Sequence, residues 1–252
     1  MPPVVIVADD FGLDTPTTAG ILRAFEEGLI SATSLMANMP GFDEAVAAAH
    51  DRQLKGAVGV HLNLTEGPSL TEPIRRCRRF ADPDGSLRWT HRFVLKLESD
   101  EVHAVGNELR AQVERIVCAG IRPAHLDSHQ HTHTSWPLGT IAMALAREFG
   151  IPAIRLSRTW PKPKPHVQLY KLLYNERLRR AGFSTMAHFG CVSDAATVLP
   201  SARGPVEVMT HPRLTENGEL IDHTSGSPLA SLIDELGLRG YGSSYSELFG
   251  LS

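Results

Sequence analysis

The chain has 252 residues, with 25 Lys and Arg against 28 Asp and Glu, and 42% of its residues are hydrophobic. This composition is that of a globular protein, and a formal net charge of -3 provides no basic surface of the kind that attracts duplex DNA or an anionic membrane. We therefore expect neither nucleic acid nor a membrane as a partner.

Cysteine usage and the first residues indicate a reducing compartment. Cys77, Cys118 and Cys191 are odd in number and far apart, which argues against a disulfide framework or a CxxC site. The apolar run at 4–8 has no basic region before it and is too short for a signal peptide or a membrane span. A cytoplasmic location is the expectation.

Short β-branched runs alternate with amphipathic segments, which is typical of parallel strands joined by helices. In chain order, strands are expected at 4–10, 57–65, 123–129, 153–157 and 206–211. Helices are expected at 17–29, 43–51, 100–119, 138–149, 167–181 and 229–236. No linker or internal repeat divides the sequence, so we expect a single α/β domain over residues 1–252.

Two irregular segments interrupt this alternation. Residues 66–99 contain several prolines, and residues 157–166 include the run Pro161-Lys162-Pro163-Lys164-Pro165. Long irregular segments in compact α/β domains often form lids or binding loops. A plain surface excursion is the alternative for both.

Polar or ionisable side chains stand at the ends of the expected strands. They are Asp9 and Asp10, His61 and Asn63, Asp127 and His129, Arg155, and His211. In parallel α/β proteins the ligand site lies at the carboxyl ends of the strands. A single histidine at a strand end is more often structural than a ligand, but five strands that end in this way predict one common site.

The segment HLDSHQHTH at 125–133 concentrates potential metal ligands. If it is extended, His125, Asp127, His129, His131 and His133 share one face. Imidazoles and carboxylates together suit Zn or another divalent first-row metal, and Mg where carboxylate and water dominate. Five ligands from one strand cannot surround an ion, so most of these histidines are expected to support other ligands, face the substrate or be structural.

The pair Asp9-Asp10 combines two carboxylates at the end of the first strand. Adjacent strand residues point to opposite faces, but a turn at Phe11-Gly12 would let both carboxylates approach one site. One could then bind metal while the other takes a proton. The alternative is that an aspartate caps the following helix, a role that Asp14 or Thr15 can also fill.

Four motifs occur in order along nearly the whole chain: ADDFG at 8–12, GVHLNLTEGPSL at 59–70, HLDSHQHTH at 125–133 and MTHP at 209–212. Together they resemble the YdjC-like carbohydrate deacetylase family, which includes the chitooligosaccharide deacetylases. The resemblance implies a distorted TIM-like (β/α) barrel of the polysaccharide-deacetylase-related type. It also implies a divalent metal, Mg or Zn, held by a triad that falls on Asp10, His61 and His129.

The same resemblance suggests further roles. Asp9 matches the catalytic base, and His211 resembles, by position, a late histidine that acts as general acid. Arg155 is expected to orient the base, while Asp127 either supports a ligand or contacts Arg155. His131 and His133 match further family histidines, and the sequence does not separate their roles or that of His125.

Sugar contacts are expected from two groups of side chains. Asn63 and Thr65 follow His61 on its side of the strand and are candidates for polar contact. Trp89, Trp160 and Tyr170 are candidates for stacking on sugar rings, with ordinary packing as an equal alternative. The stretch LSRTWPKPKP at 156–165 matches no family motif known to us, so its role as a lid is left open.

The implied reaction is the removal of N-acetyl groups from amino sugars of small oligosaccharides, with an acetylated amino-sugar oligosaccharide as the partner. A homodimer is suggested by resemblance only.

One alternative is a metal-dependent hydrolase or isomerase of a sugar phosphate or another small molecule, against which the absence of a P-loop motif counts. Another is a non-catalytic carbohydrate-binding relative, which would have no use for a second aspartate beside Asp10. A purely structural metal fits ligands from three separate strands less well than an open catalytic site does.

Overall fold

The computed structural model describes residues 1–88, 94–161 and 164–250. Trp89 and the Lys162-Pro163 part of the proline-rich run therefore lie outside the described residues.

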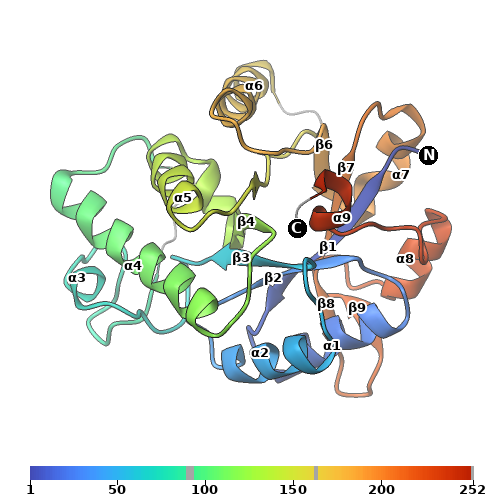
Figure 1. The fold of residues 1–252 in the computed structure, drawn as a ribbon, viewed down its shortest axis with the longest axis horizontal. Helices are drawn as coiled ribbons and strands as arrows, with labels where there is room; N and C mark the ends of the chain where they lie inside the picture. The colour runs from blue at the N-terminus through green and yellow to red at the C-terminus, as the bar shows by residue number, and fades with distance from the viewer. Residues whose placement is uncertain (89–93, 162–163, 251–252) are drawn as a thin grey trace.

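Among the described residues, seven parallel strands form one curled sheet in the order β5-β4-β3-β2-β1-β7-β6 (Figure 1). They are β1 (Val4–Phe11), β2 (Ala32–Leu35), β3 (Val58–Leu62), β4 (His125–Ser128), β5 (Ala153–Ile154), β6 (His188–Cys191) and β7 (Val206–Thr210). A bridge from Ala153 to Ser184 links the β5 edge to the segment before β6, in place of a continuous ladder. The result is an α/β half-barrel, which agrees with the distorted barrel expected from the sequence.

Helices surround the outside of this sheet (Figure 1). The longer ones are α1 (Thr15–Glu26), α2 (Phe42–Asp51), α4 (Ser99–Cys118), α5 (Trp136–Glu148), α6 (Pro165–Arg180) and α8 (Leu229–Glu235), which confirms the six expected helices. Shorter elements are α3 (Glu72–Arg75), η1 (His129–Thr134), η2 (Val192–Asp194), α7 (Ala195–Val198), η3 (Leu199–Ser201), the hairpin β8 (Pro212–Leu214) and β9 (Leu220–Asp222), and α9 (Tyr245–Phe249). None of the helices in the described ranges is long and apolar enough to cross a membrane.

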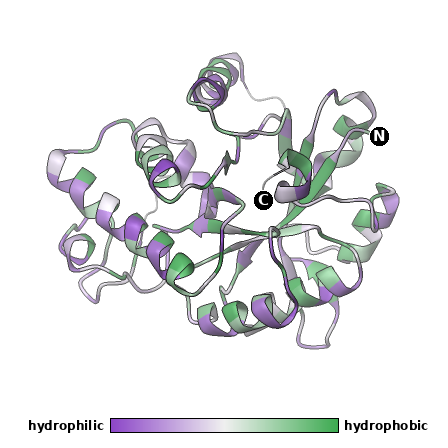
Figure 2. Cartoon of the chain, in the orientation of Figure 1, coloured by the Kyte–Doolittle hydropathy of each residue, from purple (hydrophilic) through white to green (hydrophobic). Residues whose placement is uncertain are grey.

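The two faces of β1 pack into different apolar clusters. Val4 and Ile6 belong to the large cluster that also contains the inward faces of the surrounding helices, where Figure 2 shows the apolar residues. Val5 and Val7 point into a smaller cluster inside the half-barrel, together with Tyr245 of α9. Each fully buried valine stabilises the fold by about 1.5–3 kcal/mol. A strand that is buried on both faces reads as a continuous apolar run, as Val4 to Ala8 does.

A β-bulge changes the direction of the side chains at the end of β1. The pairing of β1 with β2 shifts register between Ala8 and Phe11, and Asp10 has a left-handed backbone with φ of 70°. Such a conformation costs a non-glycine residue about 1–3 kcal/mol, and aspartate tolerates it better than most. The chain therefore already turns at Asp10, one residue before the expected turn at Phe11-Gly12. Asp14 caps α1 by accepting from the backbone N–H of Thr17 at 2.9 Å, so neither Asp9 nor Asp10 has that role.

Candidate active site

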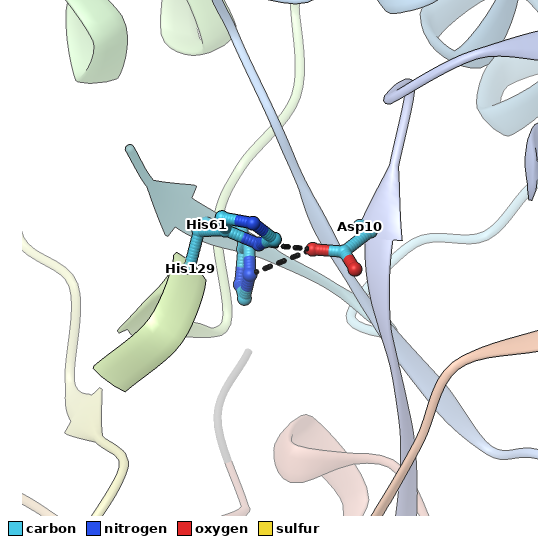
Figure 3. A group of neighbouring side chains, drawn as sticks. All are labelled: Asp10, His61 and His129. Carbon is cyan, nitrogen blue, oxygen red and sulfur yellow. Dashed lines mark hydrogen bonds and ion pairs between the residues drawn. The ribbon is translucent and has the colours of Figure 1, made fainter. Parts of the chain in front are cut away.

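The ends of β1, β3 and β4 bring Asp10, His61 and His129 together (Figure 3). Oδ1 of Asp10 lies 3.1 Å from Nε2 of His61 and 2.7 Å from Nδ1 of His129. One ligand atom from each residue lies within 4.8 Å of the other two. A carboxylate and two imidazoles from three different segments form a donor set typical of a catalytic metal site, in which further positions stay open.

Asp127 orients the ring of His61. Nδ1 of His61 lies 2.6 Å from Oδ1 of Asp127, so this nitrogen carries the proton and donates it. The buried Nε2 then faces Asp10 without hydrogen-bond geometry to any partner among the described residues. Burial alone would lower the pKa of His61, but Asp127 and Asp10 outweigh it and raise the pKa to about 10. This ring edge therefore favours a positive charge, which a proton or a metal ion can supply.

Glu66 is a contact of His129 that the sequence reasoning did not identify. Its Oε1 lies 2.7 Å from Nε2 of His129, so each ring nitrogen of this histidine faces a carboxylate. Although burial opposes the charged ring, hydrogen bonds to Asp10 and Glu66 raise the pKa of His129 to about 9. A carboxylate behind a ligating histidine is a recurrent device that fixes the ring and makes it more basic. Its place in the motif containing His61 is the signal that could have drawn attention to Glu66.

Arg155 is the centre of a second group of carboxylates. Its guanidinium donates to both oxygens of Asp9, at 2.7 and 2.8 Å, and lies 2.8 Å from Oδ2 of Asp127. Its Nε pairs with Glu207 of β7, whose other oxygen accepts from the hydroxyl of Tyr245. Burial raises the pKa of Glu207 to about 7. Glu207 was not among the residues expected at the site, and its only signal in the sequence is a glutamate inside the otherwise apolar strand segment VEVM.

Two sets of side chains have metal-ligand proximity, and the charge distribution separates them. The set of Asp9, His61 and Asp127 shares its two carboxylates with the buried cation Arg155, which disfavours a metal ion there. Asp10 has no such guanidinium partner among its described contacts, and both of its partners are imidazoles. The set of Asp10, His61 and His129 is therefore the better candidate metal site.

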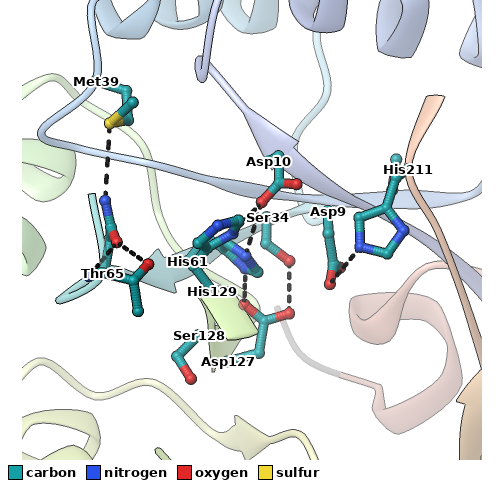
Figure 4. A network of polar contacts seen from close by, with 12 residues as sticks. Asp9, Asp10, Ser34, Met39, His61, Thr65, Asp127, Ser128, His129 and His211 are labelled. Atoms are coloured by element: carbon teal, nitrogen blue, oxygen red, sulfur yellow. Dashed lines mark hydrogen bonds and ion pairs between the residues drawn. The ribbon is translucent and has the colours of Figure 1, made fainter. Parts of the chain in front are cut away.

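His211 lies beside Asp9 at the end of β7 (Figure 4). Nε2 of His211 is 4.0 Å from Oδ2 of Asp9, and its side chain is 23% exposed. The backbone N–H of His211 donates to Asp222 at 2.8 Å, and its Nδ1 lies 2.9 Å from the hydroxyl of Thr224. The ring is thus held at one edge and open to solvent beside a carboxylate, a position suited to a proton donor.

Asn63 and Thr65 shape the loop that carries Glu66. Asn63 is fully buried, and its Nδ2 donates to the backbone oxygen of Glu66 at 2.8 Å and to Asn38 at 3.0 Å. Its Oδ1 accepts from both the N–H and the hydroxyl of Thr65, which Figure 4 labels. The amide of Asn63 is therefore engaged within the protein, whereas Thr65 is half-buried beside it.

The histidine-rich segment is not extended over its whole length, so the condition under which its five side chains would share one face is not met. Strand β4 ends at Ser128, and the chain enters the turn η1, in which Gln130 and His131 have left-handed φ values of 52° and 57°. The turn directs His129 toward Asp10 and separates it from the histidines that follow. His131 packs edge-on against Phe189, with ring centroids 5.5 Å apart.

His125 and His133 are buried structural residues. The ring of His125 stacks on Tyr245 at 4.2 Å and lies so close to Gly59 that a Cβ there would meet it at 2.4 Å. Nδ1 of His133 lies 2.6 Å from the hydroxyl of Ser128, and its Nε2 lies 3.1 Å from the backbone oxygen of Arg155. Burial lowers the pKa of both histidines to about 4, so they are neutral near pH 7.

Of the described aromatic candidates for sugar stacking, Trp160 follows the alternative of ordinary packing. Trp160 is 4% exposed and packs against Gly190, where a Cβ would come within 2.1 Å of its ring, so it belongs to the core. Tyr170 is half-buried and donates its hydroxyl to the backbone oxygen of Thr134 at 2.8 Å. The described part of the 157–166 segment is fastened at Thr159, whose N–H donates to Phe189 at 2.9 Å. Its role as a lid remains a prediction.

The half-barrel and a carboxylate–imidazole cluster at its strand ends are the features of a parallel α/β protein with a catalytic type of site. The chain belongs to the family described as YdjC-like protein, whose pattern matches residues 3–236.

Named relatives support this assignment, and a solved structure supports the fold. A carbohydrate deacetylase from Brevibacillus brevis is 32% identical over 225 residues, which are 86% of this chain and 84% of that protein. Another from Halalkalibacterium halodurans is 34% identical over 153 residues, 59% of this chain and 62% of the relative. A structure described as a putative cellobiose-phosphate cleavage protein from Enterococcus faecalis has a TM-score of 0.72 at 23% identity and covers 98% of both chains. At this identity the structural likeness shows the fold alone.

Proposed function

We propose that the protein is a metal-dependent hydrolase that removes N-acetyl groups from the amino sugars of small, chitooligosaccharide-like oligosaccharides. The relatives named carbohydrate deacetylase support the reaction class. The observation that carries the proposal is the pair of Asp9 and His211, 4.0 Å apart, beside a cluster of three metal-type ligands. A binding protein needs the cluster but not this pair.

The proposed ligands are Asp10, His61 and His129, and Mg or Zn is the proposed ion. The fit rests on the chemistry of the donors and on Nε2 of His61, which is buried without a hydrogen bond to any described residue and lies 3.1 Å from Oδ1 of Asp10. When bound, a divalent ion at such a site polarises a carbonyl group and lowers the pKa of a water molecule.

The chain's own residues supply the proton transfers. Asp9 accepts a proton from the attacking water, and Arg155, which contacts both of its oxygens, holds the carboxylate in position for this step. His211 donates a proton to the nitrogen of the departing amino sugar, so that an amine leaves instead of an unstable anion. The two groups lie on one side of the cluster, and in the proposed complex the acetamido group lies between them and the three ligands.

The test measures acetate release from di- and tri-N-acetylchitooligosaccharides by metal-stripped protein, with Mg, Zn, Mn or Co added back. We expect metal-dependent release that Asp9→Asn abolishes while its metal binding persists, and we expect His129→Ala to lose both. Asp51→Asn, at an exposed position on α2, is the matched control. Full activity of Asp9→Asn would reject the assignment of the base, and no release with any metal from protein that binds metal would reject the substrate.

Three further expectations belong to the proposal. A cytoplasmic location is supported by the three cysteines, all of which are free thiols. A single domain over residues 1–252 predicts one cooperative unfolding transition in a denaturant titration. The suggested homodimer is tested by light scattering coupled to size-exclusion chromatography.

A further inference from the structure

A buried carboxylate and a buried hydroxyl lie behind the arginine that contacts the proposed base. Glu207 of β7 accepts from Nε of Arg155 at 2.5 Å, and its other oxygen accepts from the hydroxyl of Tyr245 at 2.5 Å. All three side chains are 0% exposed. Nε is the one nitrogen of the guanidinium that Asp9 does not contact, because its two oxygens accept from the two terminal nitrogens. Tyr245 and Glu207 therefore extend the chain of hydrogen bonds that ends at Asp9, and no step of the proposed reaction uses either of them.

The location of Glu207 is unusual for a carboxylate. It is paired in register with Val5 of β1, and paired residues of neighbouring strands point to the same face of a sheet. Val5 and Tyr245 both belong to the small apolar cluster inside the half-barrel. A carboxylate among apolar side chains is costly to bury unless it is paired and hydrogen-bonded. Because apolar residues of similar volume often stabilise a fold as well as a buried ion pair does, stability alone does not account for a glutamate at this position.

The contact with Glu207 restricts the orientation of the guanidinium of Arg155. An arginine side chain has several rotatable bonds, and a hydrogen bond at Nε fixes the rotation about the last of them, the Cδ–Nε bond. Both terminal nitrogens are then directed toward Asp9, and one of them also toward Asp127. Displacement of a catalytic group by about 1 Å can cost about 100-fold in rate. The position of Asp9 therefore depends on the group that holds Nε of Arg155.

Tyr245 completes this support because it fixes Glu207. Its hydroxyl binds the second oxygen of Glu207, so both carboxylate oxygens are engaged. The ring of Tyr245 is itself held by stacking on His125, with centroids 4.2 Å apart and 12° between the ring planes. Helix α9, which carries Tyr245, is joined to β1 through the N–H of Ser243, which donates to Val4 at 2.9 Å (Figure 1). A tyrosine 38 positions after Glu207 in the chain thereby contributes to the surroundings of the proposed base.

We propose that Glu207 and Tyr245 are positioning residues of the candidate active site, which hold the guanidinium of Arg155 in the orientation that presents Asp9 to the attacking water. Their role toward Asp9 rests on the proposed deacetylation, in which Asp9 is the base. The hold on Arg155 is a property of the folded protein and does not depend on any reaction. Among the described residues, neither side chain hydrogen-bonds to one of the three proposed metal ligands, so the two residues act on the base and not on the ion.

The first experiment observes Arg155 directly, by NMR of its Nε–H group in isotope-labelled, metal-stripped protein with chelator present. Arg155→Lys identifies the resonance by its absence. We expect a downfield signal that exchanges slowly with solvent, as a buried donor to a carboxylate does. Glu207→Gln and Tyr245→Phe should shift this signal upfield and speed its exchange about tenfold or more. Tyr241→Phe, at an exposed position shortly before α9, is the matched control and should leave the signal unchanged.

An Nε–H signal of wild-type position and exchange rate in both variants would overturn the proposal. Tyr245→Phe removes a single oxygen atom, so it decides the question even if Glu207→Gln does not fold.

The second experiment separates the positioning of the base from a general loss of structure. For Glu207→Gln and Tyr245→Phe with metal added, we expect kcat for acetate release to fall about tenfold or more, with KM and metal affinity unchanged, because only the step that uses Asp9 is impaired. Glu216→Gln, at an exposed position between β8 and β9, is the matched carboxylate control. A kcat equal to that of the control in both variants would contradict the positioning role, as would a loss of metal affinity in proportion to the loss of kcat.

The two experiments distinguish the positioning role from the reaction itself. If the wild-type protein releases no acetate, the proposed deacetylation is rejected, and the NMR measurement still supports or overturns the hold of Glu207 and Tyr245 on Arg155.

Discussion

The buried guanidinium of Arg155 donates to both carboxylate oxygens of Asp9, at 2.7 and 2.8 Å. Because the same group also lies 2.8 Å from Asp127, one cation joins the proposed base to the residue that orients His61. The positions of the proposed base and of one proposed metal ligand therefore depend on a single side chain.

Replacing this cation should destabilise the protein strongly. Arg155→Met leaves the carboxylates of Asp9 and Asp127 buried without their shared partner, and breaking a buried ion pair in this way costs about 3–5 kcal/mol. Denaturant unfolding measures the change. The control Arg23→Met removes an exposed pair with Glu27 and should cost less than about 1 kcal/mol. A cost for Arg155→Met no larger than that of the control would contradict the buried network.

Glu66 should control metal affinity through His129. Glu66→Ala removes the carboxylate 2.7 Å from Nε2 of His129, and loss of such a support typically weakens metal binding about 10- to 100-fold. Competition with a chromophoric chelator measures the affinity, independently of turnover. Glu72→Ala, at an exposed position on α3, serves as the control. Unchanged affinity in the Glu66 variant would show that His129 needs no such support.

His211 should act on the leaving group. His211→Gln is expected to lower kcat for N-acetylated sugars about 100-fold or more, with metal affinity unchanged, because an amine needs a proton to depart. An acetate ester with an acidic alcohol as leaving group should lose much less activity, since its alkoxide departs without that proton. His223→Gln, an exposed neighbour, is the control. An equal loss for both substrates would place His211 outside the proton-donating role.

Stability should fall as pH decreases below about 6.5. Burial lowers the pKa of His125 and His133 to about 4, so between these values the unfolded state binds protons that the folded state does not. Each histidine then contributes a slope of about 1.4 kcal/mol per pH unit. Glu207, with its pKa raised to about 7, contributes with the opposite sign, but it does so in every variant.

The comparison of variants isolates the histidine contribution. His133→Gln should reduce the slope of unfolding free energy against pH by about 1.4 kcal/mol per unit, measured by urea unfolding between pH 5 and 6.5 with chelator present. His103→Gln, at an exposed position on α4, should leave the slope unchanged. If both variants show the wild-type slope, His133 is not neutral in the folded protein.

The sequence predicted those parts of the fold in which local pattern and burial agree. The strands β1, β3 and β7 are apolar runs and were expected, whereas β2 with the sequence ATSL was not. The hydroxyl of Thr33 donates to Ala8 at 2.8 Å and that of Ser34 to Asp127 at 2.7 Å, so these polar side chains are satisfied by neighbours from other parts of the chain. No pattern within the strand reveals such partners. β6, with the sequence HFGC, was not expected either. It is short and contains Gly190, the glycine against which Trp160 packs.

The candidate site was predictable to a similar extent. Strand ends identified Asp10, His61 and His129 as candidates, because parallel strands deliver their final residues to one edge. The contact of Glu66 with His129 joins residues 63 positions apart, so the sequence does not pair them, although Glu66 lies in the motif that contains His61. The turn after β4 was also missed, since its left-handed residues Gln130 and His131 are not of the type that usually indicates such a turn.

The left-handed backbone of Asp10 has a consequence for how this position can vary. Glutamate keeps the charge but adapts poorly to a φ of 70°, whereas glycine and asparagine accept the backbone and lose the charge. Each of these three replacements therefore loses either the charged metal ligand or the β-bulge that directs the side chain at position 10 toward the site. In a saturation library scored by metal binding, Asp10 should tolerate fewer amino acids than Asp9, although the two residues are neighbours and chemically identical.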